Sequence, residues 1–199
     1  MPTQSNKIQY GISKLAYAPI TTETDAGVPT YATPVMLPGA ISMNLSPQGE
    51  RRALSADNVE YVVTVSNGGY DGDVNIALVP DHFRLACMGE KQDAATGSNV
   101  TYETSDVIPQ RFALLGLFGG DYKNVGFVFY NCTATRPAIA SQTVDGTNGL
   151  DPTQTTDTFS ISARPRRDNK IIRAKLVDDG SETFANWFSN VYTPTVASS

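Results

Sequence analysis

Histidine and tryptophan each occur once in the 199-residue chain, and cysteine occurs twice. A Ser-His-Asp triad or a multi-histidine metal site would therefore have to be built around His82 alone. His82 falls in the first turn of an expected helix, where a hydrogen-bonded surface histidine is the commoner case. The chain also lacks G-x-S-x-G, Walker and dinucleotide-binding motifs. We therefore expect no catalytic residue, no metal ligand and no cofactor.

Positive charge is scarce, since 15 Lys and Arg face 20 Asp and Glu, for a formal net charge of −5. This balance argues against a surface that grips phosphates. The basic cluster 164–170 is interrupted by Pro165 and Asp168, so intersubunit ion pairs or plain solvation are more plausible there than nucleic-acid binding. The aspartates that loosely suggest calcium do not have EF-hand spacing, and we expect structural turns at these positions instead: Asp71, Asp73, Asp145 and Asp151.

No apolar run approaches the roughly 18 residues of a membrane span, and the first ten residues contain no apolar signal region. We therefore expect a protein made in the cytoplasm, with no membrane partner. Cys87 and Cys132 each stand beside apolar neighbours, which indicates buried free thiols rather than a disulfide framework.

What the chain does contain is glycine, proline, serine and threonine, in a mixture typical of many short strands joined by turns. We expect a single, mainly β domain over residues 1–199, a β-sandwich or partial barrel with one flanking short helix. The most informative stretch is 70–89. Val74, Ile76 and Leu78 alternate as on a half-buried strand, and Pro80 then suits the first turn of a helix that ends at Gly89.

The most apolar segments are 111–117 and 125–130, which carry apolar groups on both faces. Such a pair is either central in a sandwich or buried by a neighbouring subunit, and it is the first indication of oligomerisation. Half-buried strands are expected at 158–163 and 170–177. In a last short helix, the apolar spacing places Trp187 on a covered face.

Three polar segments stand outside this pattern. Residues 21–34 look like an extended arm or loop after the N-terminal strand, and residues 192–199 like a flexible C-terminal tail. The third, Ser46–Asn58, precedes a strong strand at 59–65 and mixes charges of both signs. It is either a solvated hairpin tip or a protruding loop that contacts another molecule, because long loops are usually functional or disordered.

The chain resembles the major tail proteins, or tail-tube subunits, of long non-contractile-tailed phages. The resemblance is carried by NKIQYGISKLAYAPIT, by PVMLPGAISMNLSPQGERRALSADN leading into VEYVVTVSNGGYDGDVNIALVPDHFRLACMG, and by DTFSISARPRRDNKIIRAKL. It implies the phage tail-tube fold, hexameric rings that stack into a tube in the virion, and a lumen through which DNA passes without specific binding. Further implied partners are the tape-measure, tail-tip and tail-terminator proteins.

The resemblance also implies that the 46–58 loop reaches the adjacent ring and that the terminal segments act as further arms. We therefore expect inter-ring contacts at Glu50, Arg51, Arg52, Asp57 and Glu60, and lumen positions at Asp71 and Asp73. The alternative is a β-sandwich ligand-binding or adhesin module, which usually displays exposed aromatic side chains in a groove. A small hydrolase is the weakest alternative, because no histidine partner set is present.

Overall fold

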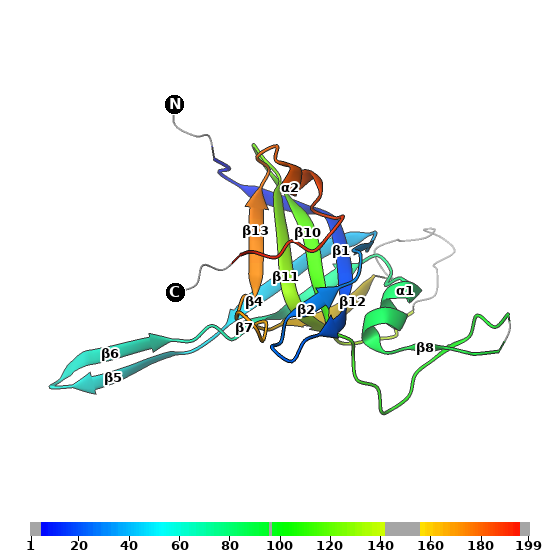
Figure 1. Ribbon diagram of the computed structural model, residues 1–199, viewed down its shortest axis with the longest axis horizontal. Coiled ribbons are helices and arrows are strands. Elements are labelled where there is room, and N and C mark those ends of the chain that lie inside the picture. The colour runs from blue at the N-terminus through cyan, green and yellow to red at the C-terminus, as the bar shows by residue number, and fades with distance from the viewer. Residues whose placement is uncertain (1–4, 96, 142–155, 196–199) are drawn as a thin grey trace, which may run out of the picture.

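The computed structural model describes residues 5–95, 97–141 and 156–195. Its main element is a nine-stranded sheet in the order β2-β1-β10-β11-β12-β7-β4, with β13 paired to β11 and β3 to β1 (Figure 1). The strands of this sheet are β1 (Gln9–Glu23), β2 (Pro29–Tyr31), β3 (Val35–Met36), β4 (Ala40–Gln48), β7 (Gly69–Ile76), β10 (Phe112–Gly120), β11 (Val125–Ala134), β12 (Asp157–Ala163) and β13 (Arg173–Val177).

Two further hairpins lie outside the main sheet. They are β5 (Arg51–Ala56) with β6 (Val59–Val65), and β8 (Lys91–Gln92) with β9 (Thr101–Tyr102). The helical segments are α1 (Asp81–Phe83), the π-helical turn η1 (Arg84–Met88) and α2 (Glu182–Ala185). The expected mainly β fold with a flanking short helix is therefore confirmed.

The sheet curls without closing. The N-terminal half of β1 comes near β4, and a hollow lined by Tyr10, Ile12, Ile41 and Met43 lies between the two strands. No hydrogen-bonded pairing joins β1 to β4 among the described strands. The sheet is thus an open, partial barrel with β4 as one end.

Strands β10 and β11 carry the core, because apolar side chains on both of their faces are buried. On one face Leu114 and Phe129 join the larger cluster, which also contains Phe83 and Phe159. On the other face Leu115 and Val128 pack in a second cluster. Of the two alternatives for this pair of strands, the central position in the fold is confirmed.

The strand-to-helix stretch 70–89 also folds as expected. Gly89 ends η1 in the left-handed conformation at φ 87° and donates its N–H to the Arg84 carbonyl, while Phe83 and Cys87 are buried. Two details differ. Pro80 is the residue that precedes the helix, and Leu78 is 67% exposed because β7 already ends at Ile76.

Irregularities in two strands change which side chains point inward. Gly11 has φ 60° at a register shift between β1 and β10, as is common for a glycine at a β-bulge. A second shift lies between Ala40 and Ser42, where β4 pairs with β7. Ile41 stands at this shift and is 52% exposed, at the edge of the hollow between β1 and β4.

The expected N-terminal arm is a hairpin in this structure. Residues 21–23 complete β1, and β2 pairs back onto β1, with Ile20 opposite Tyr31. The Gly27 turn between them lies against Arg167 so closely that an added Cβ would sit 2.6 Å from the Arg167 Cβ. Residues 21–34 therefore pack on the sheet instead of extending freely.

The C-terminal segment covers the second cluster. The Ser181 hydroxyl accepts the Phe184 N–H at the start of α2, and Trp187 is 1% exposed with its Nε1 donating to the Phe127 carbonyl at 3.3 Å. The expected covered helix face is thus present, although α2 itself is only four residues long. The expected tail begins fixed, because the Tyr130 hydroxyl donates to the Tyr192 carbonyl at 2.7 Å; residues 196–199 lie outside the described residues.

Candidate assembly and channel surfaces

The segment 46–58 is not a loop without structure. Its first residues end β4, its centre is β5, and Asp57 and Asn58 form the turn to β6 with φ 52° and 67°. Positive φ at both central residues is typical of the two-residue hairpin turn whose twist matches that of the flanking strands. Figure 1 shows this β5–β6 hairpin projecting from one end of the molecule, far from the main sheet.

The β5–β6 hairpin exposes apolar side chains along its length. Leu54 faces Val62 directly across the hairpin, and Ala56 faces Val59. Leu54 and Ala56 alternate on β5 and so share a face with the residues opposite them, and a register shift between Leu54 and Ser55 keeps Val59 and Val62 together on it. These four residues form one apolar face near the tip. Leu54, Val59 and Val62 are 63, 60 and 46% exposed. Nothing in the described part of the chain covers them.

The charged residues of the hairpin pair with one another. The Arg51 guanidinium lies 2.6 Å from the Glu60 carboxylate, and that of Arg52 lies 2.8 Å from Glu50. All four side chains are at least half exposed, so each pair contributes little to the stability of the subunit. Asp57 occupies the turn. The residues expected to make inter-ring contacts are thus gathered on one projecting element.

A glycine-containing joint connects the hairpin to the sheet. The Ser66 N–H donates to the Glu50 carbonyl at 2.9 Å and the Gly68 N–H to the Gln48 carbonyl at 2.7 Å, which continues the β4–β7 ladder toward the hairpin. At Gly49 an added Cβ would meet the Ser66 carbonyl oxygen at 2.1 Å. The joint thus depends on a close backbone approach at Gly49.

The second surface is the outer face of β4, β7 and β12, which contain no lysine or arginine. Buried apolar residues such as Val74, Phe159 and Ile161 point inward from these strands, and the alternate positions that point outward carry polar side chains. In register, its rows are Ser42–Asn75–Thr158, Asn44–Asp73–Ser160 and Ser46–Asp71–Ser162. We call this the polar face.

The polar face brings together the two aspartates expected in the lumen. Asp73 accepts a hydrogen bond from the Ser160 hydroxyl at 2.7 Å. Asp71 is paired with Arg164, which follows β12, at 2.7 Å. Hydrogen bonds from Arg164 and Ser162 hold the pKa of Asp71 below its usual value. Both aspartates therefore lie on one face, but Asp71 is partly neutralised at its edge.

The basic cluster 164–170 is used within the subunit. Besides the Arg164 pair, Arg167 lies 3.7 Å from Glu23, and Arg166, only 3% exposed, pairs with Asp168. Arg166 Nε donates to Asp168 Oδ1 at 3.0 Å. The expectation of intersubunit pairs or plain solvation is thus corrected for these three arginines, since each has an acidic partner in its own chain.

The residues considered for chemistry have structural surroundings. The His82 ring stacks on Tyr17, whose hydroxyl lies 3.0 Å from His82 Nδ1, so the hydrogen-bonded surface histidine is confirmed. Cys87 and Cys132 are buried free thiols, as expected, and burial raises the pKa of both to about 12. Asp145 and Asp151 lie outside the described residues. Among the residues that the structure describes, no group of three or more His, Cys, Asp or Glu could hold a metal ion.

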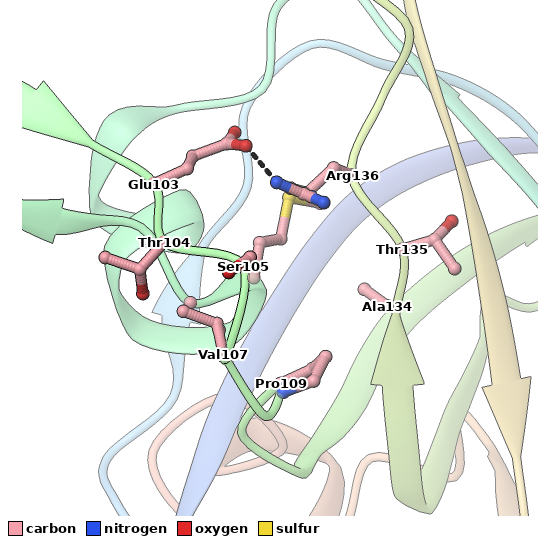
Figure 2. Close-up of a pocket in the computed structure, with 10 residues that line it drawn as sticks. Glu103, Thr104, Ser105, Val107, Pro109, Ala134, Thr135 and Arg136 are labelled. Atoms are coloured by element: carbon pink, nitrogen blue, oxygen red, sulfur yellow. Dashed lines mark hydrogen bonds and ion pairs between the residues drawn. The ribbon is translucent and has the colours of Figure 1, made fainter.

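One hollow of about 250 Å³ lies between η1, the segment after β9 and the end of β11. Figure 2 shows the Glu103 carboxylate joined to the Arg136 guanidinium on one side of it, with Val107 and Pro109 on the other. The charged pair is intramolecular and about half exposed, and the other lining groups are small or apolar. The arrangement offers no nucleophile paired with a base.

Sequence reasoning missed the hydroxyl and amide rows beside the two aspartates and the turn at the hairpin tip. The alternation of Ser42, Asn44 and Ser46 with apolar residues was a readable signal for the polar face. The Asp57-Asn58 dipeptide, between two segments of strand composition, was a readable signal for the turn.

In the described part of the chain, no helix is long and apolar enough to cross a membrane. No curated protein sequence matches the chain. A model of the family described as phage tail tube protein matches residues 2–171, which includes every strand of the main sheet except β13, and also the whole β5–β6 hairpin. Because this match spans far more than half of the sequence, the chain belongs to the phage tail tube protein family, a family of structural proteins that assemble into the tube of the virion tail.

Proposed function

We propose that copies of this subunit close into hexameric rings and that the rings stack into a tube of the long non-contractile type, through which DNA is ejected. The observation that carries the proposal is the β5–β6 hairpin, which projects from the sheet and exposes apolar side chains along its length. An isolated two-stranded hairpin in water is only marginally stable and adds little to the stability of a monomer. Burial against the adjacent ring would give the hairpin its stability.

The inter-ring contacts in this proposal are made by the hairpin, with Glu50, Arg51, Arg52, Asp57 and Glu60 around its apolar residues. Exposed ion pairs are worth little in a free subunit. At an interface they supply complementary charges that fix the orientation of the partner. In this proposal the apolar face near the tip is buried against the adjacent ring, and the charged residues fix the orientation of that ring.

The polar face is proposed to line the lumen. Side chains with hydroxyl, amide and carboxylate groups offer no cation to hold a phosphate, and the strands that bear them contain no lysine or arginine. Asp73 adds negative charge that repels DNA at short range. DNA would thus pass without specific binding, and the tape-measure protein would occupy the same channel before ejection.

Ring closure in this proposal uses the open end of the sheet. Strand β4 ends the order of the main sheet, so one of its edges has backbone groups with no strand partner in the described part of the chain. Pairing with a neighbouring subunit removes such an edge, and a rotation that closes gives a ring. The subunit acts without catalysis, is assembled in the host cytoplasm, and meets the tail-tip and tail-terminator proteins at the tube ends.

The test removes the hairpin without disturbing the sheet. Deletion of residues 50–66 joins Gly49 to Asn67 between Gln48 and Gly68, which are already hydrogen-bonded, and leaves a two-residue turn. We expect a subunit with native circular dichroism and cooperative unfolding that forms no long tubes in electron micrographs. A control outside the proposed interface, Asp25→Asn in the exposed turn between β1 and β2, should still polymerise. Normal tubes from the deletion variant would refute the proposal.

A further inference from the structure

A second exposed apolar surface lies at the end of the molecule opposite to the hairpin. It surrounds a hollow of about 330 Å³ between the segment after β7, the α1–η1 turn, β9 and the segment after β11. Figure 1 shows α1 and β8 at one end of the long axis and the β5–β6 hairpin at the other. We call this the α1 hollow, defined by Leu78, Tyr102 and Ile139.

The α1 hollow has an apolar rim above charged side chains. Leu78, Tyr102 and Ile139 are 67, 46 and 100% exposed, although they come from segments far apart in the sequence. Among the charged lining residues, Arg84 is held by Glu90 at 3.3 Å and by Asp157 at 3.2 Å, and Glu103 is paired with Arg136. The exposed apolar rim favours an apolar occupant.

We propose that the α1 hollow receives the apolar face of the β5–β6 hairpin tip, formed by Leu54, Val59 and Val62, from a second copy of the chain. This inference rests on the proposed stacking of rings and names the surface that accepts the hairpin. Both surfaces present exposed apolar side chains, and the ion pairs beside each are made within its own subunit. Contact between them buries apolar area.

The position of the two surfaces selects this occupant over a hairpin-to-hairpin contact. A contact between different surfaces at opposite ends of a molecule repeats in one direction and produces an open polymer. Two hairpins that met each other would form a closed, two-fold contact, and every second junction along a stack would then have no hairpin to make it. Only the first arrangement allows identical rings to add indefinitely.

Cysteine cross-linking in the full chain tests the contact. The native thiols are buried, so new surface cysteines are the reactive ones. The test protein carries Leu54→Cys and Tyr102→Cys together, and each single variant serves as a control. A matched third control combines Val63→Cys with Tyr102→Cys, because Val63 is also exposed but its register places it on the opposite face of the hairpin from Leu54.

All variants are concentrated until they polymerise, imaged by electron microscopy, oxidised, and run on a non-reducing gel. The Leu54→Cys, Tyr102→Cys protein should give a ladder of covalent multimers, and the single variants and the Val63→Cys pair should give monomers. Dimers from Leu54→Cys alone would overturn the inference in favour of hairpin-to-hairpin contact. Tubes without any ladder would overturn it while leaving the proposed tube intact, whereas the absence of any polymer in wild-type protein would overturn both.

Discussion

Leu54 and Val62 lie directly opposite each other across the β5–β6 hairpin, as Leu114 and Phe129 do across β10 and β11. The second pair is 0 and 5% exposed, whereas the first is 63 and 46% exposed. Two apolar pairs of the same geometry thus have opposite environments within one subunit. The hairpin thus exposes an apolar pair of the kind that the main sheet buries.

A charge on the apolar face of the hairpin should block assembly without unfolding the subunit. We expect Leu54→Asp with Val62→Asp to raise the protein concentration needed for polymerisation by at least about tenfold, equivalent to ~1.4 kcal/mol. The urea midpoint of the free subunit should stay nearly unchanged, because exposed substitutions usually alter stability by less than ~0.5 kcal/mol. Pelleting assays and urea titrations measure the two effects. Unimpaired pelleting would contradict the assigned role of this face.

A positive charge on the polar face should impede DNA passage and leave tube assembly intact. Asp73 is exposed, and only the Ser160 hydroxyl bonds its side chain among the described residues. The variant Asp73→Lys would place a ring of ammonium groups along the proposed lumen, where each phosphate contact strengthens DNA binding. We expect slower DNA release from assembled virions, with a rate that recovers as salt is added. The control Asp25→Lys, in the turn between β1 and β2, should release DNA at the wild-type rate.

Acid should weaken the subunit partly through Glu23. The hydrogen bond from Arg111, together with the charge of Arg111 and Arg167, holds the pKa of Glu23 below its ordinary value of 4.5. A depressed carboxyl pKa contributes stability that is complete above 4.5 and is lost as the pH falls through the folded-state value. We therefore expect Glu23→Gln to reduce the stability near pH 7 and to flatten its loss on acidification. Urea unfolding over a pH series measures this, and equal slopes for the wild type and Glu23→Gln would contradict it.

Removal of the Trp187 ring should destabilise the subunit strongly. The indole is buried against β11, and a Cβ added at Gly126 would lie 2.9 Å from it, so the ring fills its space closely. Truncation of a buried aromatic side chain costs about 3–5 kcal/mol. We expect Trp187→Ala to lose an amount in this range in urea unfolding. The exposed Tyr122→Ala should lose almost nothing, and an equal loss in both variants would contradict the packing described.

Much of the fold could be predicted because its signals are local. The strand-to-helix stretch ending at Gly89, the two-faced apolar strands β10 and β11, and the covered face of Trp187 each follow from spacing along a short segment. The exposure of Ile41 could not be predicted, because Ile41 lies at a register shift between β4 and β7, two strands that are distant in sequence. The same applies to the early end of β7, which leaves Leu78 in solvent.

The candidate surfaces were also predicted only in part from the sequence. The aspartates of the polar face were found, but the serines and threonines beside them become one surface only when β4, β7 and β12 pair. Arg164 and Arg167 looked free because their acidic partners, Asp71 and Glu23, lie far away along the chain. Polar interactions between remote segments are set by topology, which a single sequence does not display.

Negative-stain electron microscopy of the purified wild-type protein at high concentration tests the tube subunit assignment most directly. We expect hollow tubes of stacked rings, with sixfold symmetry in end-on views and a repeat along the axis. Isolated particles that persist after incubation with the cognate tail-tip complex would contradict it.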